Sequence, residues 1–391
     1  MLEQVKDFLG DSYNPQTGEF NAEKARAEAE EHKDKFNIIL CGATGVGKSS
    51  LVNAVFGEEI VKSGVGSPVT QHLEKITVPR KGLVLWDTKG IESKDYENTI
   101  NQLKNDIFHA FNDSSHEDDV PHLGWVCIDS SGARIEERDI EIIGILREKE
   151  IPVVVVFTKI LGDESADFIE AAISEINAHH GDFINGRYVK VNSRERKILN
   201  ISIPVSGLDD LVDISFKALP ESKSRARQAL KKAQMVKMEE RLEAMKDSAK
   251  LIVHTSSVAA GVVGATPVPG SDAPLIAGVQ STMIYKINSE FELDITTSAS
   301  ASIISGILGV TAVAQVGKTI VSNVLKFIPG VGSVVGGAIS AATAVGLTEA
   351  IGHAYIQVLA SYYDKTTGKV LLPESVSVVL DLFKKYFTYK K

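Results

Sequence analysis

The chain has 391 residues, a net charge of −9, and 43% hydrophobic and 24% charged residues. This length exceeds that of a typical single core and predicts two domains plus an appendage, and the acidic balance argues against binding nucleic acid through bulk charge. Cys41 and Cys127 fall within or at the end of apolar runs, which predicts buried thiols in a reducing compartment. The N-terminus lacks a basic segment followed by an apolar run, so we expect no secretory signal and a cytoplasmic protein.

The first predicted element is a charged, solvated helix over residues 21–35. Apolar runs then alternate with helical stretches as far as Pro220. Strands are expected at 36–41, 72–78, 82–87, 123–129, 153–158 and 188–192, with helices after 49 and at 95–112, 136–148, 165–179 and 208–218. This alternation predicts a doubly wound α/β sheet that is mostly parallel. The link between 78 and 82 is too short for a helical crossover, so strands 72–78 and 82–87 should form an antiparallel hairpin at one edge.

A phosphate-binding motif follows the first strand. Gly42, Ala43, Thr44, Gly45, Val46, Gly47, Lys48 and Ser49 match the pattern G-x-x-x-x-G-K-[ST], and Ser50 continues into the next helix. Glycines let the backbone wrap around phosphate oxygens, and the helix that follows points its N–H groups at them. Lys48 supplies charge to the β- and γ-phosphates, and Ser49 supplies a hydroxyl to Mg²⁺. The motif between a strand and a helix therefore predicts triphosphate binding.

Two further segments fit the same chemistry. The sequence D-x-x-G runs from Asp87 to Gly90, and a carboxylate at the end of that strand can hold Mg²⁺ through water. Gly90 allows a backbone N–H to approach the γ-phosphate. Residues 63–70 have two interpretations: a flexible loop entering an edge strand, or a switch segment in which Thr70 presents an oxygen to Mg²⁺.

The base side of the site is less clearly marked. The buried strand 153–158 ends in Thr158, and Lys159 follows it. The stem of this lysine could cover the flat face of a base. The alternative is an ordinary strand that ends in polar residues.

The sequence changes character after Pro220. Residues 221–250 form a charged stretch with periodic apolar positions, which predicts an amphipathic helix linking two domains. Residues 251–271, 295–317 and 327–347 carry no Asp, Glu, Lys or Arg and are long enough for membrane spans. Leucine and aromatic residues are sparse in them. Two interpretations stay open: a tightly packed helical bundle, which we favour, and direct insertion into a membrane.

With these motifs in order, residues 36–219 resemble the Ras-like GTPase domains, particularly the Era-like and immunity-related GTPases. The resemblance implies a Ras-like α/β domain followed by an all-α domain, with GTP or GDP and Mg²⁺ as the bound groups. It assigns catalytic roles to Lys48, Thr70 and Gly90, metal binding to Ser49, Thr70 and Asp87, and base recognition to Thr158, Lys159, Asn192 and Ser193.

The rest of the chain is also similar to known proteins. Residues 267–275 and 326–332 resemble a poorly characterised helical domain that follows some Era-like GTPase domains. We therefore expect an N-terminal helical segment at 1–35, a GTPase domain at 36–220 and a helical domain at 221–391. Such relatives are often associated with membranes and dimerise through their GTPase domains, which implies a second copy and the cytosolic face of a membrane as partners. No nucleic acid partner is expected, and no effector is indicated.

Three positions depart from the family pattern. Leu161 stands where relatives place the guanine-binding Asp, and Asp163 is the nearest acid that could replace it. Ile91 stands where Ras-like enzymes often carry the Gln that orients water, which implies slow hydrolysis unless another residue, a partner or a second copy helps. Gly45 stands where potassium-activated relatives carry Asn, so no potassium requirement is expected.

The sequence therefore predicts a protein that hydrolyses GTP and acts as a nucleotide-dependent switch. One alternative is a scaffold that binds GTP but scarcely hydrolyses it. Another is a membrane-remodelling protein in which the nucleotide controls insertion of the Ala/Gly-rich helices. Use of ATP is a minor alternative.

Overall fold

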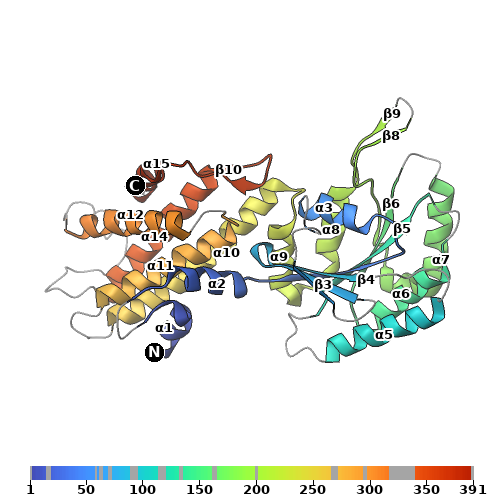
Figure 1. Ribbon diagram of the computed structural model, residues 1–391, viewed down its shortest axis with the longest axis horizontal. Coiled ribbons are helices and arrows are strands. Elements are labelled where there is room, and N and C mark those ends of the chain that lie inside the picture. Colours follow the sequence, from blue (N-terminus) through green and yellow to red (C-terminus); the bar gives the residue numbers. More distant parts are fainter. Residues whose placement is uncertain are drawn as a thin grey trace. The chain divides into compact units, whose positions relative to one another are not determined.

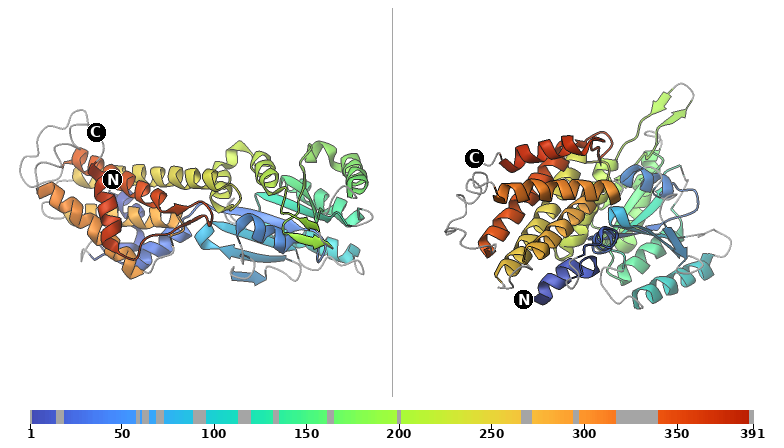
Figure 2. Two further views of the ribbon diagram at one scale, coloured as in Figure 1. Left: turned by 90° about the horizontal axis from the view of Figure 1, so that it is seen from above. Right: turned by 60° about the vertical axis from the view of Figure 1, so that its left-hand side comes forward.

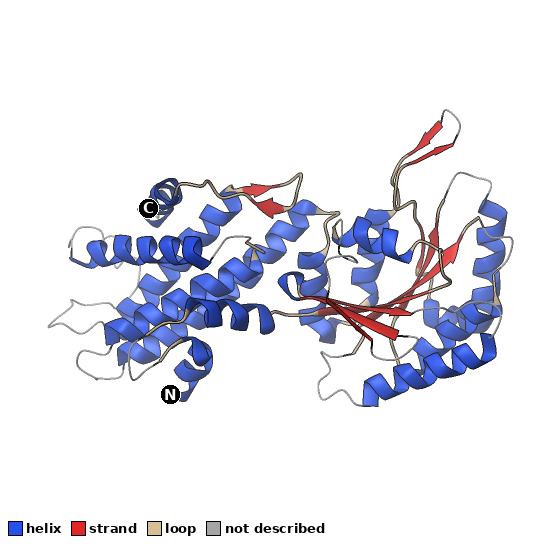
Figure 3. Cartoon of the chain, viewed as in Figure 1, coloured by secondary structure: helices blue, strands red, loops and turns tan. Residues whose placement is uncertain are grey.

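The computed structural model describes residues 2–14, 19–57, 60, 65–68, 73–88, 96–112, 120–131, 135–160, 165–198, 201–265, 272–293, 297–316 and 340–388. The chain divides into two compact units. Asp34–Arg241 is called the sheet unit here, and Met1–Lys33 together with Leu242–Lys391 is called the helical unit. Figure 3 separates them by secondary structure: the large sheet belongs to the first unit, while helices dominate the second.

A seven-stranded sheet forms the centre of the sheet unit, in the order β2-β3-β4-β1-β5-β6-β7 (Figure 1). Its strands are β1 (Phe36–Cys41), β2 (Val65–Pro68), β3 (Leu73–Val78), β4 (Leu83–Thr88), β5 (Leu123–Asp129), β6 (Val153–Thr158) and β7 (Tyr188–Lys190). Strands β4, β1, β5, β6 and β7 are parallel neighbours, whereas β2–β3 and β3–β4 are antiparallel. The predicted doubly wound, mostly parallel sheet is confirmed.

The edge of this sheet differs from the prediction. The β3–β4 pair is antiparallel as expected, but β2 pairs with β3 and takes the edge position. Strand β2 has only four residues, Val-Gly-Ser-Pro. Such a segment has no apolar alternation, and Gly and Pro are depleted in strands, so local patterns gave no sign of it.

Helices cover both faces of the sheet (Figures 1 and 2). One core cluster joins the sheet to α3 (Lys48–Phe56), α8 (Leu208–Ala218) and α9 (Ser224–Ala233). The opposite cluster joins it to α5 (Tyr96–Asn112), α6 (Glu137–Glu148) and α7 (Ala166–Ile184). Successive residues of β1 alternate between them, with Ile38 in the first and Ile39 in the second. Burial on both faces explains why these strands are continuous apolar runs.

The predicted linker helix over 221–250 is instead two helices with a break. A short 3₁₀ turn, η5 (Glu221–Lys223), leads into α9, and α10 (Met238–Ala265) starts after the break. Buried Gln234 stabilises the break: its Oε1 accepts hydrogen bonds from the backbone N–H groups of Val236 and Lys237, each at 2.7 Å. Leu230 of α9 is fully buried in the core of the sheet unit. The boundary therefore falls after Arg241 and not at 220, because the apolar face of α9 packs on the sheet.

The helical unit contains α1 (Leu2–Leu9), η1 (Gly10–Ser12), α2 (Ala22–Glu31), most of α10, α11 (Asp272–Glu290), α12 (Thr297–Val316), α14 (Ala341–Ser361), the short hairpin β10 (Tyr363–Asp364) and β11 (Lys369–Val370), and α15 (Val376–Thr388). The N-terminal helices pack on α11, and the Lys33 ammonium donates to the Ser289 carbonyl at 2.6 Å. Residues 1–33 are thus part of this unit, and not the separate segment 1–35 that the sequence predicted.

Small residues bring the helices of this unit close together. A Cβ added at Gly352 of α14 would lie 2.3 Å from Val253 Cγ2 of α10, so only glycine allows that approach. Among the described residues, no helix is long and apolar enough to cross a membrane. The described residues leave out most of the apolar stretch 327–347. They also leave out the loops 267–271 and 326–332, on which the resemblance of this region to a known helical domain is based.

Candidate functional site

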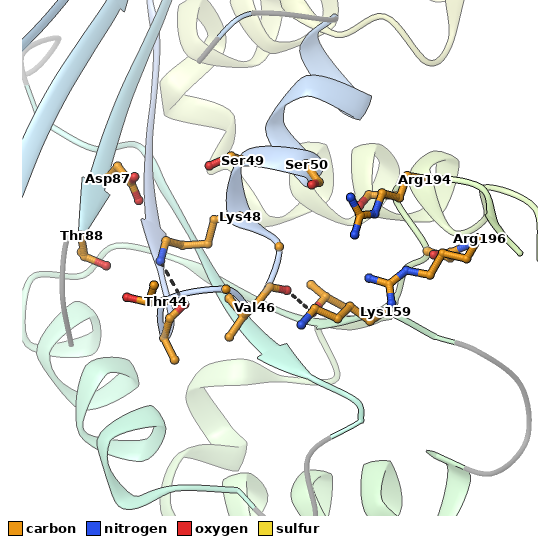
Figure 4. A pocket seen from close by; sticks show the side chains of 16 residues that line it. Thr44, Val46, Lys48, Ser49, Ser50, Asp87, Thr88, Lys159, Arg194 and Arg196 are labelled. Atoms are coloured by element: carbon orange, nitrogen blue, oxygen red, sulfur yellow. Dashed lines mark hydrogen bonds between the residues drawn. The ribbon is translucent and has the colours of Figure 1, made fainter. Parts of the chain in front are cut away.

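A cavity of about 390 Å³ lies in the sheet unit, where β1, β4 and β6 end (Figure 4). It is lined by Ala43, Thr44, Gly45, Val46, Gly47, Lys48, Ser49, Ser50, Asp87, Thr88, Thr158, Lys159, Asn192, Ser193, Arg194 and Arg196. Parallel strands β1, β4 and β6 bring their carboxyl ends to one edge, so residues more than a hundred positions apart meet there. Four of the lining residues are Lys or Arg and one is Asp, so the cavity suits an anionic ligand.

The loop between β1 and α3 requires glycine at two points. Gly42 has φ +134°, and a Cβ there would lie 2.4 Å from the backbone oxygen of Cys127. Gly47 has φ +104° and is the N-cap of α3. Both conformations are costly for residues with a side chain, so the motif glycines give the loop its shape. The loop thereby leads directly into the first turn of α3, whose N–H groups and positive dipole end attract anions.

Lys48 and Ser49 begin α3 beside the loop. The Lys48 ammonium donates to the carbonyl oxygens of Gly42 at 2.7 Å and Ala43 at 3.3 Å, which holds its charge over the loop (Figure 4). Ser49 is exposed to the cavity. Asp87 lies on β4 at the position paired with Leu40 of β1, and it lines the same cavity.

The oxygens of Ser49 and Asp87 suit Mg²⁺. This ion prefers hard oxygen ligands and usually binds through one or two protein oxygens, substrate phosphates and water. A serine hydroxyl and a carboxylate at the phosphate end of the cavity supply such oxygens. The described part of the chain contains no group of three or more His, Cys, Asp or Glu residues that could hold a metal by themselves.

The end of β6 is tied to the phosphate loop. The Thr158 hydroxyl donates to the Val46 carbonyl at 2.7 Å and lies 3.2 Å from the Ile128 oxygen. Lys159 follows with φ +58°, and its ammonium pairs with the carboxylate of Asp129. Burial raises the pKa of Asp129, but hydrogen bonds from Lys159 and Ser131 outweigh it, so the pKa is lowered. An ionised Asp129 therefore fixes the lysine beside the cavity.

Asn192 and Ser193 also line the cavity. Asn192 is buried, and its amide nitrogen donates to the Pro204 carbonyl at 2.7 Å, so it anchors the chain that returns to α8. Thr70, Gly90 and Asp163, and also Ile91 and Leu161, lie outside the described residues. Of the predicted residues that the structure describes, all but Gly42 line the cavity, and Gly42 shapes the loop.

Three lining residues were not predicted from the sequence: Thr88, Arg194 and Arg196. The Thr88 hydroxyl donates to the Leu40 carbonyl at 3.0 Å and joins the ends of β4 and β1. The two arginines follow Ser193 and lead into the hairpin of β8 (Arg196–Ile198) and β9 (Ile201–Ile203). Their position directly after the predicted base-contact residues was the available signal, but charged residues in a loop are usually solvated.

The prediction of buried thiols is confirmed for both cysteines, which are free. Cys41 ends β1 and Cys127 lies on β5, under the phosphate loop. Burial raises the pKa of both thiols, that of Cys127 to about 12. Both thiols therefore stay protonated and serve as packing groups.

This phosphate loop, with Asp87 and Lys159 beside it, defines a P-loop nucleotide-binding domain. Residues 37–159 match the family described as "50S ribosome-binding GTPase", and residues 225–385 match "Domain of unknown function (DUF697)". The chain therefore has a segment similar to that GTPase family, followed by a segment similar to a domain of unknown function, in the order that its sequence predicted.

Individual relatives match only in part. Small ribosomal subunit biogenesis GTPase RsgA of Clostridium kluyveri is 39% identical over 71 residues, which are 16% of this chain and 24% of that protein. The chain spans about a quarter of the length of the curated relatives it matches.

Among solved structures, Aquifex aeolicus Era bound to GDP·AlF4⁻ aligns with a TM-score of 0.31 at 23% identity, over 47% of this chain and 56% of that one. Era in complex with MgGDPNP and part of 16S ribosomal RNA aligns with a TM-score of 0.31 at 20% identity, over 48% and 58%.

Proposed function

We propose that the protein binds GTP in this cavity and hydrolyses it to GDP and phosphate with Mg²⁺, as a nucleotide-dependent switch. The observation that carries this proposal is the meeting of Lys48, Ser49 and Asp87 with Thr158 and Lys159 in one cavity. The first three residues suit the phosphates and the metal, and the last two suit the base. The GTPase family match supports the same assignment.

In the proposed reaction, water adds to the γ-phosphorus, the bond to the β–γ bridging oxygen breaks, and GDP, inorganic phosphate and a proton leave. The protein contributes position and charge. Lys48 and the N–H groups of the loop stabilise charge on the phosphate oxygens, and Ser49 and Asp87 would hold Mg²⁺. Mg²⁺, when bound, neutralises the charge that develops on the β- and γ-phosphates. By the resemblance, Thr70 would add a metal ligand and Gly90 a backbone N–H to the γ-phosphate.

Replacing Lys48 tests nucleotide binding. Lys48→Ala removes the only side-chain ammonium that hydrogen-bonds to the loop among the described residues, and GTP binding and turnover should both be lost. Lys217→Ala is the matched control, because Lys217 is an exposed lysine of α8 that does not line the cavity. Unchanged GTP affinity in Lys48→Ala, measured by calorimetry with ATP as the competing nucleotide, would refute the assignment.

The rate of hydrolysis distinguishes a second candidate function, favoured by Ile91. An isoleucine cannot orient water, so a single copy should hydrolyse GTP slowly, and a second copy would supply the missing group. Turnover per molecule that rises steeply with protein concentration supports an enzyme activated by dimerisation. Turnover that stays near background at every concentration supports the GTP-binding scaffold instead.

The nucleotide state is proposed to act on the helical unit and, through it, on a membrane surface. The Ala/Gly-rich composition of residues 251–271 and 297–316 motivates this part of the proposal. Liposome flotation with GTP, with GDP and without nucleotide tests it. Recovery of the protein in the soluble fraction under all three conditions would contradict a membrane role.

A further inference from the structure

Two arginines that line the nucleotide cavity, Arg194 and Arg196, have no role in the proposed hydrolysis. Arg194 and Arg196 follow Ser193, and Figure 4 shows both guanidinium groups directed toward the cavity, on the side of Ser50 and Lys159. Arg194 is exposed and Arg196 is half-buried. Figure 4 shows Asp87 on the far side of the cavity, so both arginines lie at the end away from Asp87.

The backbone holds Arg196 in place. Arg196 starts β8 and pairs with Ile203 of β9 in a two-stranded hairpin that projects from the sheet unit (Figures 1 and 2). Below this pair, the backbones of Asn192 and Ser206 exchange two hydrogen bonds, at 3.1 and 3.0 Å. The Val191 N–H donates to the Phe157 carbonyl of β6 at 2.8 Å. This ladder ties the base of the hairpin to the same strand end that carries Thr158 and Lys159.

The guanidinium of Arg196 has an unused donor. Its Nε atom is buried and has no hydrogen-bond partner within the part of the chain that the structure describes. An arginine stays charged, and leaving a buried donor of a charged group unpaired costs more than leaving a neutral one unpaired. The protein covers Nε, so a ligand in the cavity would meet the terminal nitrogens of this guanidinium, which Figure 4 shows directed toward the cavity.

The ends of the cavity identify the part of the nucleotide that Arg196 meets. Lys48, Ser49 and Asp87 mark the phosphate end, so the base lies toward Lys159 and Ser193. The charged groups that line the base end are all donors. Guanine presents two acceptors, O6 and N7, along one edge, whereas adenine presents an N6 donor beside N7. A bidentate arginine fits the guanine edge and is repelled by the adenine amino group.

We propose that Arg196 binds the O6/N7 edge of guanine and determines the preference of this site for guanine over adenine nucleotides. This inference rests on the proposed function, because it requires a nucleotide in the cavity. It adds a specificity-determining residue on the stem of the β8–β9 hairpin.

The test measures GDP, ADP and 7-deaza-GDP affinities by calorimetry on the full chain. Arg196→Ala should weaken GDP binding by about 5- to 150-fold, the range expected for one bidentate arginine–guanine pair, and should not weaken ADP binding. Arg196→Lys should recover only part of the loss, because an ammonium is not bidentate. The native protein should bind GDP more tightly than 7-deaza-GDP, which lacks N7, and this difference should disappear in Arg196→Ala.

Lys197→Ala is the matched control. Lys197 is the next residue of β8, is exposed and does not line the cavity, so all three affinities should remain native. Equal weakening of GDP and ADP by Arg196→Ala would overturn the proposal, because it would place Arg196 on the ribose or a phosphate. Unchanged GDP affinity would overturn it as well. Failure of the native protein to bind any of the nucleotides would instead contradict the proposed function itself.

Discussion

Thr158→Val tests how the sheet fixes the phosphate loop. Valine has nearly the same shape, so the change removes the hydroxyl that donates to Val46 at 2.7 Å and little else. Thr158 is 4% exposed, so water cannot readily replace this donor. Loss of a buried hydrogen bond that leaves one partner unsatisfied costs about 1–3 kcal/mol. We expect a fall of about 2 kcal/mol in the free energy of unfolding of the sheet unit, close to a 30-fold change in its folding equilibrium.

Urea unfolding followed by tryptophan fluorescence measures this change. The chain has two tryptophans, Trp86 on β4 and Trp125 on β5, so the signal reports the sheet unit alone. GDP affinity, measured in parallel, should fall several-fold, because the Val46 peptide lines the cavity. Ser215→Ala is the control: it removes the acceptor for buried Trp125 Nε1, at 2.9 Å, and neither of these residues lines the cavity.

The two variants should differ in only one respect. Ser215→Ala should lose stability to a similar extent and keep native GDP affinity. If Thr158→Val kept native stability and native affinity, the hydrogen bond to Val46 would have no role in holding the loop. If both variants lost affinity equally, the effect would follow from general destabilisation, and the reasoning would be refuted.

Two further changes test the loop and the base end. Gly42→Ala should destabilise the sheet unit by about 3 kcal/mol or more, because its Cβ would meet the Cys127 oxygen at 2.4 Å. Gly45→Ala, with no atom within 4 Å of the added Cβ, should cost only about 1 kcal/mol for its positive φ. Equal losses in the two urea titrations would contradict the steric argument. Asp129→Asn removes the ionic partner of Lys159 and should weaken GDP binding by about 3- to 10-fold in calorimetry, the net effect of roughly one ordinary hydrogen bond. Because the pKa of the Asp129 carboxyl is lowered in the folded state, its stabilisation is present above the usual value of 3.8 and is lost as pH falls through the lower folded pKa. The stability difference between native protein and Asp129→Asn should therefore be constant from pH 5 to 8 and shrink below about pH 4; a difference that grows in acid would contradict this sign.

Much of the sheet unit follows from local sequence. Strands β1, β5 and β6 have the predicted bounds, because each is an apolar run that ends at polar or glycine residues. Helix α8 also has its predicted bounds. The phosphate loop was evident from Gly42 to Ser49 because the chemistry of phosphate binding restricts those positions directly.

Other features depended on contacts between distant residues. The four-residue strand β2 is defined by its pairing with β3, and α9 belongs to the sheet unit because Leu230 is buried in its core. The N-terminal helices join the helical unit through contacts with α11, more than 250 positions away in the case of Lys33 and Ser289. The spacing of apolar residues along the sequence shows which face of an element is apolar, but it does not show which other face that one packs against.

The functional site shows the same division. By itself, the sequence determined the phosphate loop, the carboxylate at Asp87 and the lysine at Lys159, because each lies at the end of a recognisable strand or directly after it. Only the tertiary structure decided that Arg196 lines the same cavity. Its position depends on the pairing of β8 with β9 and on the attachment of this hairpin to β6, and these backbone hydrogen bonds join segments whose local sequence does not specify a partner.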